Sequence, residues 1–128
     1  AFNKLQPDIR KNLTINQAGL DRIVYTSNET KEDRKIMRQG WENAKKVINS
    51  GEADLVVLDE INIAVDLNII DEKDVLETIK NKPENVEIVM TGRNAHKSIM
   101  EAADLVSNIQ AVKHYYDAGV MARQGIEY

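Results

Sequence analysis

The chain has 128 residues, 42% of them hydrophobic and 30% charged, which suits one globular domain over residues 1–128 and excludes a disordered chain. Its 17 basic and 21 acidic residues leave a net charge of −4, which excludes an overall basic field for nucleic acid, and it has no cysteine for disulfides or thiolate metal sites. No apolar run approaches the roughly 20 residues needed to cross a bilayer, so we expect a cytoplasmic protein without a membrane or nucleic-acid partner.

The start of the chain is typical of the interior of a protein. It carries no initiator methionine, and residues 5–8 (Leu-Gln-Pro-Asp) have the composition of a loop. No apolar segment of a secretory signal follows. We therefore expect this sequence to be a portion of a longer gene product.

Residues 1–22 show no periodic pattern, and residues 22–25 predict a short strand that enters a loop at 26–29.

Residues 30–50 carry the clearest helix signal. Thr30, followed three residues later by Asp33, resembles a capping box with Asp in place of Glu. An apolar stripe then recurs at helical spacing; it comprises Ile36, Met37, Trp41, Ala44, Val47 and Ile48. Gly51 supplies the helix stop. The stripe predicts a helix that packs on the core, with Trp41 inside that core.

A first strand and a second helix follow. Four consecutive branched apolar residues at 55–58 predict a parallel strand that is buried on both faces. Asp71 is suited to cap the next helix, and Pro83 ends it. The apolar residues of this helix are Val75, Leu76 and Ile79.

A second strand, a short helix and a third strand candidate complete the pattern. Residues 86–90 predict the strand, Ile99, Met100 and Ala103 mark the helix, and residues 104–106 begin the candidate strand. Helices between strands imply right-handed crossovers and a mostly parallel α/β sheet flanked by helices. Sheets of this kind bind ligands at the carboxyl ends of their strands.

Asp59 and Glu60 end the first strand and have the form of a Walker B element. Such a strand holds carboxylate oxygens where a magnesium ion bridging nucleotide phosphates sits. Because side chains alternate along a regular strand, Asp59 and Glu60 cannot share one direction. Taken alone, acids that end a strand are more often caps or solvated turn residues than metal ligands.

Thr91-Gly92-Arg93 ends the second strand. A glycine permits close backbone approach, and a guanidinium can reach phosphate oxygens, although a tight turn before a surface arginine has the same pattern. The run from Val112 to Tyr128 is rich in donors, glycines and aromatic residues without a regular period. It suits a loop that closes over a ligand or an ordered tail. Within it, His114 has no sequence-evident partner, which favours a structural or solvated role over proton transfer.

Together these segments resemble the bacterial-type corrinoid adenosyltransferases. The resemblance runs in family order and spacing from about residue 31 to the end of the chain. The matching segments are residues 56–64 (the Walker B segment), 91–94 (a second signature), 102–106 (a third), and 112–114, 117–120, 122 and 125–128 (the ending). The ordered set is specific, although no single motif is.

The resemblance implies a P-loop NTPase-like (RecA-like) fold that works as a homodimer. It implies an enzyme that transfers the 5′-deoxyadenosyl group of ATP to the Co(I) centre of cobalamin or a corrinoid precursor and releases triphosphate, in adenosylcobalamin biosynthesis and salvage. An electron-donating flavoprotein would supply the reduced corrinoid. No general base is needed for this transfer, which agrees with the lack of a Ser/His/Asp constellation in the sequence.

The resemblance also assigns residues to roles. Glu60 would coordinate Mg²⁺ with support from Asp59, and Arg93 would approach the triphosphate and stabilise its charge as it leaves. The remaining expected ATP-site residues are Thr91, Gly92, Lys113 and His114. Tyr25 and Ile23 would face the corrin ring. The family usually has an aromatic residue where Ile23 stands, so the resemblance does not fix the detail of lower axial-ligand displacement, although an isoleucine can still exclude water.

One family feature is not found in these residues. The family opens with a strand, a glycine-rich loop ending Gly-Lys-Thr-Thr, a helix and another strand, but no G-x-x-x-x-G-K-[ST] occurs in the 128 residues. Without this N-terminal βαβ part we expect the polypeptide alone to be inactive, because the loop cradles the phosphates. We also expect an exposed apolar edge or face on the sheet. Two other functions stay open: another P-loop ATP hydrolase, and a non-catalytic corrinoid-binding protein.

Overall fold

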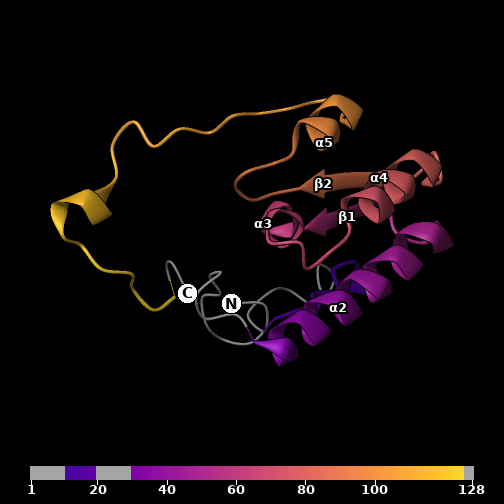
Figure 1. Cartoon of the computed structure of the whole chain (residues 1–128), viewed down its shortest axis with the longest axis horizontal. Coiled ribbons are helices and arrows are strands. Elements are labelled where there is room, and N and C mark those ends of the chain that lie inside the picture. Colours follow the sequence, from indigo (N-terminus) through magenta and orange to yellow (C-terminus); the bar gives the residue numbers. More distant parts are fainter. Residues whose placement is uncertain (1–10, 20–29, 126–128) are drawn as a thin grey trace. The chain divides into compact units, whose positions relative to one another are not determined.

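The computed structural model describes residues 11–19 and 30–125. These residues belong to two compact units, which we describe separately: one within residues 16–105, and one formed by residues up to 15 together with residues from 106 onward. The larger unit contains helices α2 (Lys31–Ser50), α3 (Ile61–Asp66), α4 (Glu72–Asn81) and α5 (Lys97–Ala102) and strands β1 (Leu55–Leu58) and β2 (Glu87–Met90) (Figure 1). No helix in the described ranges is both long and apolar enough to pass through a bilayer.

The two strands form a small parallel sheet, as predicted. Leu55 pairs with Glu87 at one end and Leu58 with Met90 at the other. Both arrowheads in Figure 1 point towards α3, so the carboxyl ends of β1 and β2 lie at the same edge. The described residues therefore have an α/β architecture in which helices accompany a parallel sheet.

One face of this sheet packs against the helices and the other is open. Leu58 is buried, whereas Leu55 and Val57 are 56% and 55% exposed and Val89 is 44% exposed. The prediction that the first strand is buried on both faces is therefore wrong. Alternation along the strands places these three exposed side chains on one face, and the expected exposure of an apolar face is found there.

Local sequence signals set the limits of α2. Thr30 and Asp33 form the predicted capping box, in which the Thr30 side chain accepts from the Asp33 N–H and the Asp33 side chain accepts from the Thr30 N–H. Gly51 ends the helix in a left-handed conformation, with φ 69°. Trp41 and Ile48 are buried as predicted, but Val47 is 42% exposed, because it lies at the edge of the apolar stripe rather than in it.

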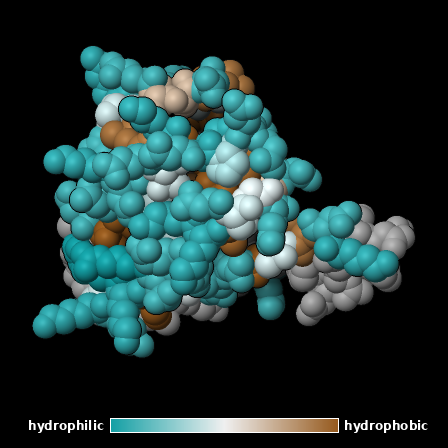
Figure 2. All heavy atoms as spheres, turned by 90° about the vertical axis from the view of Figure 1, so that its right-hand side faces the viewer, coloured by the Kyte–Doolittle hydropathy of each residue, from teal (hydrophilic) through white to brown (hydrophobic). Residues whose placement is uncertain are grey.

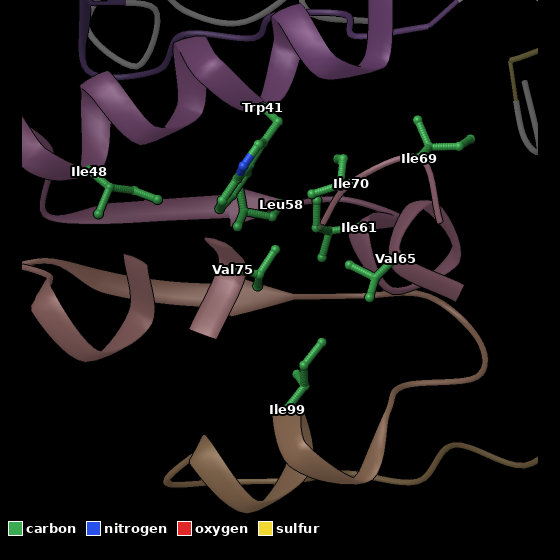
Figure 3. Packing of buried hydrophobic residues seen from close by; sticks show 9 residues of the cluster. All are labelled: Trp41, Ile48, Leu58, Ile61, Val65, Ile69, Ile70, Val75 and Ile99. Atoms are coloured by element: carbon green, nitrogen blue, oxygen red, sulfur yellow. The ribbon is translucent and has the colours of Figure 1, made fainter. Parts of the chain in front are cut away.

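All the helices of the larger unit contribute to one hydrophobic core. In Figure 3, Trp41 projects from α2 towards Leu58 and Val75. The buried residues of this core are Trp41, Ile48, Leu58, Ile61, Val65, Ile69, Ile70, Val75 and Ile99 (Figure 3). The view of Figure 2 shows a mostly hydrophilic surface with hydrophobic atoms in small separate areas. The core therefore lies between the sheet and the helices, beside the edge where the strands end.

The third strand candidate, residues 104–106, is not a strand. Leu105 is 84% exposed and Val106 is 52% exposed, and within the described residues no strand pairs with them. An apolar pair without a neighbouring strand gains neither ladder hydrogen bonds nor burial. The predicted strand at residues 22–25 lies outside the described residues.

The described residues of the smaller unit include the 3₁₀-helix η2 (Tyr115–Ala118). The Nδ1 atom of His114 accepts from the Tyr116 N–H (3.1 Å) and so caps this turn. The guanidinium of Arg123 lies 5.3 Å from the ring centroid of Tyr115. His114 therefore caps the first turn of η2 through its side chain.

Candidate functional site

The acids that end β1 contact the residues that end β2. The Thr91 hydroxyl donates to Asp59 Oδ1 (2.6 Å) and accepts from the Glu60 N–H (2.8 Å). The Thr91 carbonyl accepts from the Asn62 N–H (3.2 Å). The two strand ends thus contact each other, and Thr91 is the residue that joins them.

Glu60 occupies an unusual backbone position. It is the residue before α3 and has a left-handed conformation, with φ 58°, which is uncommon for a residue other than glycine. The regular strand ends at Leu58, so the rule that alternating side chains diverge does not apply to Asp59 and Glu60. Both side chains are exposed. Strained backbone of this kind gathers at functional sites, and here it sets the direction of a carboxylate.

Gly92 lies close to this carboxylate. Its φ is 123°, and a Cβ atom added there would lie 3.2 Å from Asn62 Cβ and 3.3 Å from Glu60 Oε2. The predicted close approach of a glycine is present, and its neighbours are protein atoms of the β1–α3 turn. Gly92 thereby allows the β2 end and the Glu60 side chain to share one small space.

Arg93 follows at the surface of the same edge. Its side chain is exposed. In residues 11–19 and 30–125 it makes no hydrogen bond or salt bridge. An arginine fork without a protein partner can bind a phosphate oxygen pair without first breaking an ion pair.

Asn62 is a site residue that the sequence reasoning missed. It is 7% exposed, and its Oδ1 atom has no hydrogen-bond partner in the described part of the chain. A buried acceptor without a partner costs about 1–3 kcal/mol, so such atoms usually face a water, an ion or a ligand. The signal in the sequence was an asparagine in the first turn of a helix that follows two strand-end acids.

The donor set suits magnesium of the kind that nucleotides bring. Mg²⁺ binds through one or two carboxylates and takes its other ligands from water and phosphate. Asp59 and Glu60 supply the carboxylates; Asn62, whose buried side-chain oxygen has no hydrogen-bond partner among the described residues, has its Cβ near Gly92, as does the Glu60 carboxylate. Among the described residues no group of three or more His, Cys, Asp or Glu side chains is placed to hold a metal. An ion here would therefore depend on phosphate and water for most of its ligands.

The other expected site residues belong to other parts of the chain. Lys113 and His114 belong to the smaller unit, and their part in an ATP site stays a prediction. Ile23 and Tyr25 lie outside the described residues, and their role facing a corrin ring stays a prediction.

Comparisons with known proteins match this chain to one enzyme family. A family model described as "ATP:corrinoid adenosyltransferase BtuR/CobO/CobP" matches residues 1–128. A corrinoid adenosyltransferase of a Sinorhizobium species is 36% identical over 107 residues, covering 83% of this chain and 50% of that protein. The Escherichia coli K12 corrinoid adenosyltransferase is 33% identical over 106 residues, covering 83% of this chain and 54% of that protein. The chain thus spans about half the length of these curated relatives.

Proposed function

Because the chain belongs to the ATP:corrinoid adenosyltransferase family, we propose that this protein transfers the 5′-deoxyadenosyl group of ATP to the Co(I) centre of a corrinoid. The cobalt electron pair attacks the 5′ carbon of ATP, a Co–C bond forms, and the C5′–O bond breaks. The bond's electrons leave with triphosphate. The observation that supports this function best is the hydrogen-bonded junction of Asp59, Glu60 and Thr91 at the edge that also presents Arg93.

The roles proposed for the site residues are to neutralise the negative charge that develops on the leaving triphosphate. Triphosphate gains negative charge as it leaves, so preorganised positive charge lowers the barrier. Glu60, with Asp59 beside it, would hold the Mg²⁺ that neutralises part of this charge. Arg93 would contact the departing phosphates, while Thr91 fixes the acids and Gly92 makes room for Glu60.

Several further properties belong to the same proposal. By family resemblance the complete fold is P-loop NTPase-like, the protein acts as a cytoplasmic homodimer, and a flavoprotein supplies the electron that forms Co(I). Lys113 and His114 would join the ATP site, and Tyr25 with Ile23 would face the corrin ring. The absence of a G-x-x-x-x-G-K-[ST] motif from these 128 residues makes the complete gene product the right material for testing.

The test is adenosyl transfer by that gene product, after its intact mass has been compared with the 14.5 kDa of this chain. A larger product is incubated with MgATP and chemically reduced cobalamin, and both adenosylcobalamin and the released phosphates are measured. The proposal requires one triphosphate per adenosylcobalamin. Release of orthophosphate without a corrinoid would instead indicate an ATP hydrolase. A product of 14.5 kDa is expected to bind MgATP poorly because it has no phosphate-binding loop.

Glu60→Gln is expected to slow adenosyl transfer about 10- to 100-fold, the range for losing a group that holds or orients a metal. The neutral amide keeps the shape of the side chain but weakens Mg²⁺ binding, so the Mg²⁺ concentration for half-maximal rate rises as well. Glu84→Gln is the matched control, because Glu84 is exposed in the turn before β2, at the opposite end of the sheet. Equal rates in the two variants would remove Glu60 from the proposed site.

Arg93→Ala is expected to weaken ATP binding about 10- to 150-fold, because a charge-assisted hydrogen bond contributes about 1.5–3 kcal/mol. Arg93→Lys keeps the charge but loses the planar fork, so its affinity should fall between those of the wild type and the alanine variant. Calorimetric titration with ATP measures all three proteins. Unchanged affinity in Arg93→Ala would show that the guanidinium does not touch the nucleotide.

A further inference from the structure

The loop that carries Arg93 is tied to two helices by a small polar cluster. Asn94 Nδ2 donates to Asp66 Oδ2 (2.8 Å) at the end of α3. His96 Nδ1 lies 3.0 Å from Glu72 Oε2 in the first turn of α4, and the Ser98 hydroxyl also donates to Glu72. The cluster therefore spans α3, α4, α5 and the loop between β2 and α5, and all its members lie in the larger unit.

Both ring nitrogens of His96 face carboxylates. Besides the contact between Nδ1 and Glu72, His96 Nε2 lies 3.8 Å from Asp66 Oδ1. An ionised carboxylate only accepts hydrogen bonds, and a neutral imidazole has only one N–H. A neutral His96 would leave a ring lone pair opposite a carboxylate, whereas the imidazolium donates towards both. This arrangement fits the protonated ring.

The electrostatic surroundings agree with that geometry. The hydrogen bond to Glu72 raises the pKa of His96 above its ordinary value of 6.5; partial burial opposes the rise, and the charges of Glu72 and Asp66 add to it. Glu72 and Asp66 are the titratable groups that face the ring from α4 and α3. Lys97, next to His96, pairs instead with Glu101. The hydrogen bonds from Ser98 and His96 lower the pKa of Glu72, which keeps it ionised.

Asp66 connects the histidine to the residue beside Arg93. One of its oxygens faces His96 and the other accepts from Asn94. Asn94 has a left-handed backbone, with φ 57°, and such a conformation persists where surrounding contacts fix it. A change in the charge on His96 therefore acts on Asp66, and through Asp66 on the backbone that follows Arg93.

We propose that His96 is a positioning residue for the phosphate-binding edge, and that its protonated ring bridges Asp66 and Glu72 to fix the Arg93–Asn94 loop. That this edge binds phosphate rests on the proposed function. The contacts of His96 with Asp66 and Glu72 do not depend on it. A group with a raised folded-state pKa contributes fully when pH is below its ordinary pKa, and the contribution is lost as pH rises through the folded-state pKa. Phosphate binding should therefore weaken over that range.

Proton NMR of the whole protein tests the bridge. The chain has two histidines, so a His114→Gln variant identifies the resonances of the His96 ring among those of this chain. The pKa of His96 should lie above 6.5 and should fall in Asp66→Asn. The backbone amides of Arg93 and Asn94 should shift with the same midpoint as the ring, and lose that shift in Asp66→Asn. An ordinary pKa, or amides that do not follow the ring, would overturn the inference.

Binding of inorganic tripolyphosphate tests the consequence. We expect the ratio of wild-type affinity to His96→Gln affinity to fall about fivefold, the lower end of typical coupling between sites, as pH rises through the pKa of His96. Taking the ratio cancels the titration of tripolyphosphate itself. Lys97→Gln removes a neighbouring positive charge and should leave the pH dependence as in the wild type. A ratio that does not change with pH counts against His96. If neither protein binds tripolyphosphate, the proposed function fails, and the amide titration alone decides the inference.

Discussion

Replacing Gly92 by alanine is expected to lower the free energy of unfolding by about 2–6 kcal/mol, since backbone strain and overpacking each cost about 1–3 kcal/mol. A side chain is disfavoured there first by the backbone, because φ is 123°. The added methyl also meets Asn62 Cβ at 3.2 Å and Glu60 Oε2 at 3.3 Å. Glu60 can move its carboxylate, but the Asn62 Cβ is fixed by α3, so part of the clash must be relieved by the loop. Chemical denaturation followed by circular dichroism measures the loss.

Gly51→Ala separates the two contributions. Gly51 also has positive φ, at 69°, but its nearest neighbours to an added Cβ lie at 3.6 Å or more, which is ordinary van der Waals contact. Its substitution should therefore cost only the left-handed backbone term, about 1–2 kcal/mol. Gly92→Ala should cost more and should also displace Glu60, which raises the Mg²⁺ requirement. If the two variants lose the same free energy of unfolding, the close contacts of Gly92 with Asn62 and Glu60 do not add to the loss.

The parts of this fold that sequence predicts are those set by local chemistry. The capping box of Thr30 and Asp33 and the glycine stop at Gly51 depend only on neighbouring residues, and both are found. A general rule pointed to the residues that follow the two strands, because parallel α/β sheets bind ligands at the carboxyl ends of their strands. The hydrogen bond between Thr91 and Asp59 is found at that edge. Burial of Trp41 followed from helical spacing in the same way.

The parts that sequence missed depend on which element lies next to which. An unbroken apolar run does not tell how many faces of a strand are covered, and Val57 is half exposed because no helix of the described residues covers its face. Asn62 belongs to the candidate site because Gly92 lies close to it. His96 belongs to the polar cluster because Asp66 and Glu72 flank its ring. These contacts join residues 24 or more positions apart, so no local pattern records them.

Replacing Trp41 by alanine is expected to lower the free energy of unfolding by about 3–5 kcal/mol, the usual cost of removing a buried large aromatic side chain. Trp41 is 5% exposed and lies in the core between α2 and the sheet. It also joins α2 to α4, because its Nε1–H donates to Asp74 Oδ2 at 2.6 Å. Both the packing and the hydrogen bond are lost in the alanine variant, and urea denaturation measures the sum.

Trp41→Phe separates the contribution of packing from that of the hydrogen bond to Asp74. Phenylalanine keeps most of the apolar packing but has no donor for Asp74. The Asp74 side chain is 37% exposed and still receives a hydrogen bond from Lys45 Nζ at 2.7 Å, so water can replace the indole N–H. We therefore expect Trp41→Phe to cost about 1–2 kcal/mol, near the lower end for a hydrogen bond to a charged group. If phenylalanine costs as much as alanine, the link to α4 through Asp74 rather than the filling of the core is what Trp41 contributes, and the helix pair would depend on one polar contact.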